Sequence, residues 1–162
     1  MLVAHRQKMA AQYRLIGETP VPRDIPAGTF FAPCAFAIPA FDAIKSDVFG
    51  PILHVYAFEA DELLSLVDRI NASGYGLTLG IHSRIEETIE AIRARAHVGN
   101  VYVNRNQIGA VVGVQPFGGE GLSGTGPKAG GPHYLFRFAS ERTFTVNTAA
   151  AGGNAALIAS SE

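Results

Sequence analysis

The stretch Gly99–Phe138, GNVYVNRNQIGAVVGVQPFGGEGLSGTGPKAGGPHYLFRF, decides how this 162-residue chain is interpreted. Nine of the 18 glycines of the chain lie within it, between Gly109 and Gly131. Glycine reaches backbone conformations that other residues avoid, and it places no side chain in the way of a neighbour. The stretch therefore predicts a backbone that is shaped to approach another group closely.

Short apolar runs of strand length recur along the chain. They are Ile52–Phe58, Leu77–Ile81 and Asn100–Val103, with an earlier run at Thr29–Ile38 that Pro33 interrupts. Gly17–Gly28 contains three prolines and predicts a loop. Arg142–Asn147 alternates apolar and polar residues and predicts a late strand.

Helical patterns separate these strands. Leu2–Tyr13 has a weak helical pattern, and Asp61–Ile70 places its apolar residues on one helical face. Ser83 and Glu86 match a capping box, which predicts a helix that ends near Gly99. Alternating strands and helices are typical of an α/β fold, so we expect a largely parallel sheet with flanking helices.

Composition and charge do not favour nucleic-acid binding, membrane association or secretion. The net charge of −1 provides no electrostatic attraction to nucleic acid or to an anionic membrane. No apolar stretch approaches the ~20 residues that span a bilayer, so no transmembrane segment is expected. The N-terminal residues lack the apolar core of a signal peptide, and a single cysteine suits a reducing compartment. These features predict a cytoplasmic protein.

One motif within the glycine-rich stretch lacks the context that its chemistry needs. Gly119, Gly121 and Gly124 have the spacing of a dinucleotide-binding fingerprint. That fingerprint requires a strand before it and a helix after it, whereas Pro116 precedes these glycines and Pro127 follows them. We therefore assign them no dinucleotide-binding role.

The residue types that most often carry chemistry are sparse. Cys34 is the only thiol, and it lies in the apolar run FFAPCAFAI, with no acid, base or cation within four residues. A cysteine in such surroundings behaves as a small apolar residue, so we expect it to be inert. The five histidines show no metal-ligand spacing, and no metal is expected.

Five segments, taken together in order and spacing, resemble the aldehyde dehydrogenase superfamily. They are Asp47–Pro51 (DVFGP), Ile52–Phe58, Tyr75–Leu77, Gly99–Asn104 and Gln115–Gly119. The resemblance implies that residues 1–140 are the C-terminal portion of the catalytic domain, and that residues 141–162 form an oligomerisation strand and a C-terminal tail. The run GAVVGVQPFGGEGLSGTGPKAGGP is similar to L-glutamate γ-semialdehyde dehydrogenases, and TVNTAAAGGNA to the bacterial bifunctional proline-utilisation proteins.

This resemblance implies NAD-dependent oxidation of L-glutamate γ-semialdehyde to L-glutamate in proline catabolism. Asp47 would bind the hydroxyls of the nicotinamide ribose, and Phe49 would pack beside the nicotinamide ring. The family usually has a glutamate where this chain has Asp47, which is one methylene shorter. The alternative for this motif is a structural turn before a strand.

The same resemblance implies an anchor for the α-carboxylate of the substrate. The backbone amides of Gly109 and Ala110 would bind the carboxylate, and Phe117 would pack on the aliphatic part of the substrate. A nest of amides can bind an anion without a basic side chain. Arg105 offers an alternative, an ion pair with the carboxylate. We expect Gly109→Val to crowd the nest and to force a backbone conformation that β-branched residues avoid.

The nucleophilic cysteine, the general-base glutamate and the dinucleotide-binding domain of the family precede the matched region. We therefore expect no catalytic residue in this chain, which alone would be inactive. Its partners would be the remainder of the parent enzyme, with FAD needed only by a preceding proline dehydrogenase domain, and a second copy in a homo-oligomer. The alternative is a free-standing, non-catalytic oligomerisation module.

Overall fold

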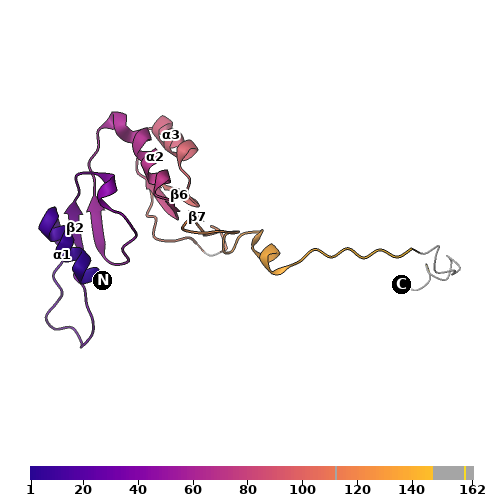
Figure 1. Cartoon of the computed structure of the whole chain (residues 1–162), viewed down its shortest axis with the longest axis horizontal. Helices are drawn as coiled ribbons and strands as arrows, with labels where there is room; N and C mark the ends of the chain where they lie inside the picture. The colour runs from indigo at the N-terminus through magenta and orange to yellow at the C-terminus, as the bar shows by residue number, and fades with distance from the viewer. Residues whose placement is uncertain (112, 148–158, 160–162) are drawn as a thin grey trace.

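The computed structural model describes residues 1–111, 113–147 and 159. Figure 1 shows two lobes side by side, with α1 and β2 in the first and α2, α3 and β6 in the second. Beyond residue 139 the described chain leads away from both lobes as an extended segment.

The first lobe is a three-stranded sheet covered on one face by a helix. The helix is α1 (Leu2–Gln12), and the strands are β1 (Arg14–Glu18), β2 (Cys34–Ala37) and β3 (Ile52–Val55). Strand β2 lies in the middle, antiparallel to β1 and parallel to β3. The helix is held on the sheet by Met9, which packs with Cys34, Phe36 and Ile38, all of them buried.

The second lobe packs two helices on a parallel strand pair. Its helices are α2 (Leu63–Ala72) and α3 (Glu86–Arg95), and its parallel strands are β5 (Thr78–Ile81) and β6 (Asn100–Val103). The core contains Val67 of α2, Ile81 of β5 and Ile92 of α3. Two short 3-10 helices, η1 (Phe41–Ala43) and η2 (Ala60–Glu62), precede α2.

The glycine-rich segment packs against this second lobe. Strand β7 (Glu120–Gly121) pairs antiparallel with β4 (Tyr75–Gly76), and the segment ends in the 3-10 helix η3 (Tyr134–Phe138). A Cβ atom on Gly99 would overlap the carbonyl oxygen of Gly118, so the two backbones touch at a place where only glycine fits. At this place the chain makes the predicted close approach to itself.

Most predicted elements are present, but the pairing of the strands is more mixed than expected. The β1–β2 and β4–β7 pairs are antiparallel, so the described sheets are mixed rather than largely parallel. Strand β1 was not predicted, and its second half falls within the expected loop Gly17–Gly28. Its five residues are all exposed at the sheet edge, so neither face of the strand is buried. The sequence therefore shows no alternation of apolar and polar residues that would predict it.

The predicted capping box of α3 is wrong. Helix α3 begins at Glu86, which makes Glu86 the first helical residue rather than the third. The Ser83 hydroxyl instead accepts a hydrogen bond from the Ile85 amide at 3.0 Å. A capping box does occur at η2, where Glu59 and Glu62 exchange side-chain and backbone contacts.

The late strand predicted for Arg142–Asn147 is not formed among the described residues, since residues 141–147 pair with no strand. They are exposed, and a strand needs a partner to supply its ladder of hydrogen bonds. The predicted C-terminal tail lies almost entirely outside the described residues.

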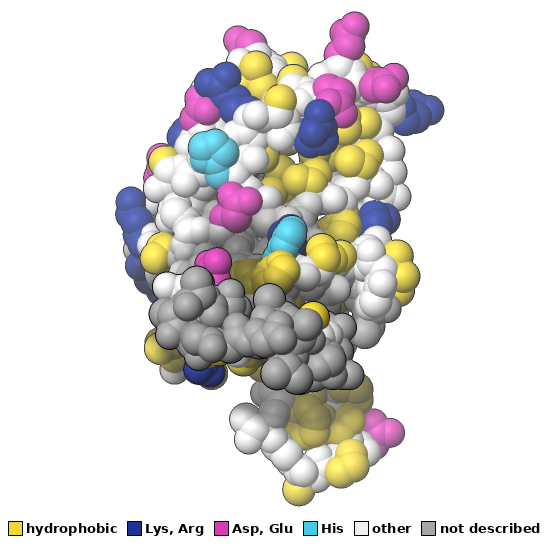
Figure 2. Space-filling view, turned by 90° about the vertical axis from the view of Figure 1, so that its right-hand side faces the viewer, with side chains coloured by type: hydrophobic (Ala, Val, Ile, Leu, Met, Phe, Trp, Pro, Cys, Tyr) yellow, Lys and Arg dark blue, Asp and Glu magenta, His cyan; other side chains and the backbone are white. Residues whose placement is uncertain are grey.

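The chain exposes far more surface than a compact monomer. Its accessible surface is 12318 Å² for 17.1 kDa, whereas roughly 7,700 Å² is typical of a folded monomer of this mass. Figure 2 shows hydrophobic side chains uncovered among the described atoms, with charged groups gathered toward the upper rim. No helix among the described residues combines the length and hydropathy of a membrane span.

Candidate functional site

The predicted substrate anchor begins where β6 ends. Asn104 has a positive φ of 54°, a conformation that asparagine tolerates better than most residues. Its side chain accepts a hydrogen bond from the Ser83 amide at 3.1 Å and donates one to the Ser83 carbonyl at 2.8 Å. Asn104 thereby links the end of β6 to Ser83, two residues beyond β5, at the start of the anchor loop, which is residues 105–111 and 113–115.

Arg105 supports this loop from within. Each nitrogen of its guanidinium donates a hydrogen bond inside the loop: Nε to the Asn106 carbonyl at 3.0 Å, Nη1 to Gln115 Oε1 at 3.0 Å, and Nη2 to the Gly109 carbonyl at 3.2 Å. The guanidinium also lies over the ring of Tyr102, with its carbon 4.4 Å from the ring centre. Arg105 is therefore occupied by the protein itself.

The amides of Gly109 and Ala110 are the predicted ligands of the carboxylate. No residue that the structure describes accepts a hydrogen bond from either of them. A Cβ atom on Gly109 would meet no heavy atom within 4 Å, and Gly109 does not have a positive φ. The expectation that valine would strain this backbone is therefore wrong, because a side chain here would extend into open space.

Phe117 is held at the far end of the same segment. Its amide and carbonyl pair with those of Ala129 at 3.0 and 2.9 Å. The side chain of Asn100 holds the two residues that flank Phe117. It donates a hydrogen bond to the Pro116 carbonyl at 3.0 Å and accepts one from the Gly118 amide at 3.3 Å. The backbone of Phe117 is thus fixed by hydrogen bonds, and the residue is only partly buried.

Asp47 and Phe49 lie in the first lobe, on the turn that leads into β3. The Phe49 side chain is 90% exposed, and Asp47 is exposed with no described ion pair or hydrogen bond. The turn rests on α1, because a Cβ atom on Gly50 would overlap the side chain of Leu2. The motif is thus both a structural turn and a pair of uncovered functional groups.

Asp47 also borders a cleft of about 630 Å³ between the two lobes. One wall contains Tyr56 and Asp42, and the other contains Arg69 of α2. Arg69 bonds Asp42 at 3.1 Å and lies 5.8 Å from the Tyr56 ring centre. The cleft therefore brings a carboxylate, a cation and aromatic faces to one place.

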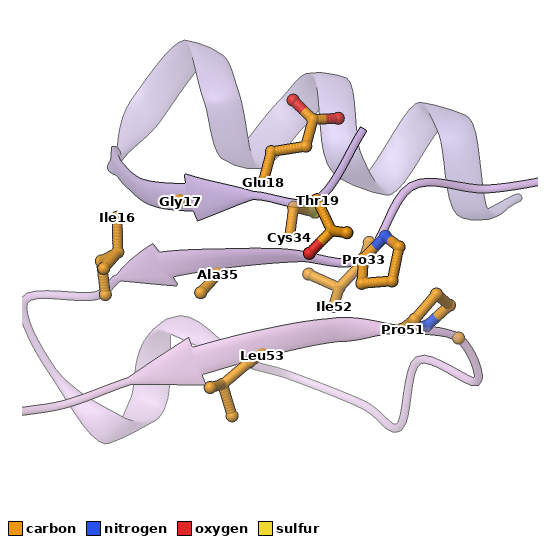
Figure 3. A pocket seen from close by; sticks show the side chains of 11 residues that line it. Ile16, Gly17, Glu18, Thr19, Pro33, Cys34, Ala35, Pro51, Ile52 and Leu53 are labelled. Atoms are coloured by element: carbon orange, nitrogen blue, oxygen red, sulfur yellow. The ribbon is translucent and has the colours of Figure 1, made fainter. Parts of the chain in front are cut away.

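A second depression, of about 600 Å³, lies on the uncovered face of the first sheet. Figure 3 shows Ile16, Ala35 and Leu53 along three neighbouring strands, with α1 behind the sheet. Ile16 and Leu53 are 47% and 60% exposed. This apolar face has no cover from the described residues.

The other sequence candidates have structural places. Cys34 is 6% exposed and packs with Met9 and Phe36, as its apolar surroundings predict. His5 and His54 form an unpredicted pair, with their Nε2 atoms 3.1 Å apart between α1 and β3. Burial, followed by repulsion from His5, lowers the pKa of His54 below its ordinary value.

The glycines with the spacing of a dinucleotide fingerprint lie in a tight turn that no helix follows directly. Gly121 lies in β7, and among the described residues the next helical element is η3, at Tyr134. A Cβ atom on Gly124 would overlap the Gly119 carbonyl, so these glycines serve close packing of the turn on itself.

The predicted site thus falls into two groups. Gly109, Ala110 and Phe117 belong to one continuous segment, and Asp47 with Phe49 belongs to the other lobe. No described hydrogen bond or ion pair joins the two groups. Sequence reasoning missed Asn100 and Gln115, although both lie inside the family's motifs, because a motif does not say which backbone group a side chain will meet.

Comparison with known proteins places this arrangement in a family. The aldehyde dehydrogenase family model matches residues 2–144, so the chain belongs to the aldehyde dehydrogenase family. A bifunctional protein PutA of Klebsiella aerogenes is 64% identical over 115 residues, covering 71% of this chain and 9% of that protein.

Two solved structures extend the comparison. The first, a variant of Bradyrhizobium japonicum proline utilization A, superposes with a TM-score of 0.84 and 56% identity, over 92% of this chain and 15% of the other. The second is a 1-pyrroline-5-carboxylate dehydrogenase from Thermus with bound NAD, with a TM-score of 0.71 and 34% identity over 85% and 26% of the two chains. The chain therefore spans only a small part of each relative.

Proposed function

We propose that this chain supplies the substrate anchor and the nicotinamide-side contacts of an NAD-dependent L-glutamate γ-semialdehyde dehydrogenase. The observation that carries the proposal is the anchor loop, which leaves the Gly109 and Ala110 amides without a described partner. Two such amides bind one carboxylate, and each hydrogen bond to a charged group contributes ~1.5–3 kcal/mol. Phe117 would cover the aliphatic part of the substrate.

The residues of the first lobe fit the nicotinamide end of NAD. The Asp47 carboxylate is exposed and has no described partner, so it is free to accept hydrogen bonds from two ribose hydroxyls. The Phe49 ring is almost fully exposed and offers a flat face to a planar ring. When bound, NAD accepts the hydride that the aldehyde loses on oxidation. Asp47 and Phe49 would orient it.

The remaining chemistry would come from the rest of the parent enzyme. Its nucleophile and general base are expected there, since Cys34 is buried among apolar side chains. The uncovered sheet face along Ile16 and Leu53 is where that remainder would pack. Residues 141–162 would pair with a second copy in a cytoplasmic homo-oligomer. Of these, Phe144 is 81% exposed.

The anchor is tested by Gly109→Val in the complete enzyme. Valine would fill the space in front of the amides, and losing two charge-assisted bonds would lower kcat/KM for glutamate semialdehyde by roughly two to four orders of magnitude. Propanal has no carboxylate and should be oxidised almost as before. The measurement is the ratio of the two kcat/KM values. An unchanged ratio in a variant of normal thermal stability would contradict the proposal.

A further inference from the structure

We propose that Arg105 and Gln115 are positioning residues that set the preference for carboxylated aldehydes without touching the carboxylate. They brace the anchor loop from behind, so that its amides stay aimed at the substrate. The inference rests on the proposed function and deepens it. It also decides between the two explanations that the sequence leaves open, amide binding and an ion pair with Arg105.

The first argument is the geometry of the peptide group between Gly109 and Ala110. Arg105 Nη2 donates to the carbonyl oxygen of this group at 3.2 Å. A trans peptide directs its carbonyl oxygen and its N–H to opposite sides. Arg105 on the carbonyl side therefore places the Ala110 N–H on the side away from the guanidinium. A carboxylate bound by that N–H would lie across the peptide from Arg105 and out of its direct reach.

The second argument is the role of Gln115. Its Oε1 atom accepts from Arg105 Nη1 and from the Val111 amide, both at 3.0 Å. The backbone closes the same ring, because the Gln115 amide donates to the Val111 carbonyl at 2.9 Å. The amide after the anchor is thus turned inward and fixed, while the two before it remain available. Gln115 is uncharged and cannot act as an ionic ligand.

The third argument is electrostatic. A cationic donor on a carbonyl polarises the peptide and strengthens the N–H on its other side. The guanidinium itself is held in place, since it lies over Tyr102, a residue that is 5% exposed. Arg105 would therefore polarise the peptide and increase the partial positive charge on the Ala110 N–H. The anchor would then bind an anion more strongly than two ordinary amides.

The test uses the complete enzyme with Arg105→Gln, Arg105→Lys, Gln115→Ala and the Arg105→Gln/Gln115→Ala double variant. Each single change should lower kcat/KM for glutamate semialdehyde by ~10–100-fold, mainly through KM, because the amides lose their aim. Propanal oxidation should change by less than about threefold. The double variant should be little worse than the worse single variant, since both residues hold the same loop. Arg84→Gln, on an exposed residue before α3, is the matched control.

A second readout needs no substrate. Hydrogen exchange of the amides at residues 106–111 should become faster in Arg105→Gln and in Gln115→Ala, and stay unchanged in Arg84→Gln. Arg105→Lys should resemble Arg105→Gln, because an ammonium does not reproduce the planar fork of a guanidinium. Restored substrate preference in Arg105→Lys, or a lost preference with unchanged exchange in Arg105→Gln, would overturn the brace and assign Arg105 to the carboxylate. Additive losses in the double variant would overturn the shared brace.

The proposed function fails separately. If Gly109→Val keeps the preference for the carboxylated aldehyde, the anchor itself is wrong, and the inference falls with it. If Gly109→Val loses the preference while Arg105→Gln keeps both its preference and its slow exchange, the anchor stands and only the brace is wrong.

Discussion

Two regions hold their functional groups in opposite ways: the anchor segment, which is the glycine-rich segment with Gly109, Ala110 and Phe117, and the motif Asp47–Pro51. In the anchor segment, Asn100, Arg105 and Gln115 each bond backbone or side-chain groups of the same segment, and the backbone touches itself at its glycines. In the motif, Asp47 has no described partner and Phe49 is 90% exposed, and the turn beneath them rests on α1 through Gly50.

The difference indicates what fixes the position of the functional groups in each region. The anchor carries its own supports, so its shape is already present in this chain. The motif presents two side chains on a turn, and under the proposed function the cofactor and the rest of the enzyme would fix them. Substitutions in the anchor segment should therefore lower both the free energy of unfolding and the preference for carboxylated aldehydes. Substitutions in the motif should change NAD kinetics alone.

Gly99→Ala should have the largest effect on the anchor segment. The new Cβ atom would overlap the Gly118 carbonyl oxygen and lie 2.8 Å from the Gly119 Cα atom, so backbone must move. Overpacking of this kind costs about 3 kcal/mol of unfolding free energy. Arg84→Ala is the control, since Arg84 is exposed and lies outside both regions. Equal midpoints of denaturant unfolding for the two variants of the complete enzyme would refute the self-supporting anchor.

Asp47→Ala should separate chemistry from stability. Losing the ribose contacts and the position they impose should lower kcat/KM for NAD on the order of 10²-fold. The melting temperature should stay within about 1 °C, because exposed residues without partners contribute little to stability. Asp47→Glu restores the family's usual carboxylate and should keep NAD kinetics within a few-fold. Unchanged NAD kinetics in Asp47→Ala would leave the motif with its structural role only.

How much the sequence predicts differs between the two regions. The helices, β3, β5 and β6 follow from apolar periodicity, because burial on one face leaves a pattern in the chain. Strand β1 leaves none, since all its residues are exposed.

The chemistry of the site follows the same division. The anchor and motif residues come from family resemblance, but the brace at Arg105 does not, because its carbonyl partners lie on the backbone and leave no trace in residue type.

Cys34→Ala should affect packing and leave the reaction intact. Cys34 is buried in the first lobe against Met9 and Phe36, so removing its sulfur should cost about 1 kcal/mol of unfolding free energy. The rate of NADH formation by the complete enzyme should stay within about twofold at a temperature where both proteins are folded. The 162-residue chain alone should form no NADH. Turnover that Cys34→Ala abolishes would identify this thiol as the nucleophile.

The smallest expected effect concerns the histidine pair beneath the motif. The Nε2 atoms of His5 and His54 are 3.1 Å apart, and a hydrogen bond between them needs one bare nitrogen. Burial and the neighbouring His5 lower the pKa of His54 in the folded chain below its ordinary value of 6.5. Below about pH 6.5 the unfolded chain therefore binds a proton that the folded chain resists. The stabilisation is complete above that pH and is lost as the pH falls toward the folded pKa.

Acid should consequently weaken the contact between α1 and β3. Helix α1 also supports the turn of the motif, through Leu2 and Gly50. The melting temperature, measured between pH 8 and pH 5, should fall more steeply for the native chain than for His54→Gln, whose amide can still donate to His5 but does not titrate. The comparison is best made as the difference between the two proteins at each pH, because that difference removes the titration of all other groups. If the two curves run parallel, the pair carries no pH-dependent stability, and α1 is held on the sheet by Met9 and its apolar neighbours alone.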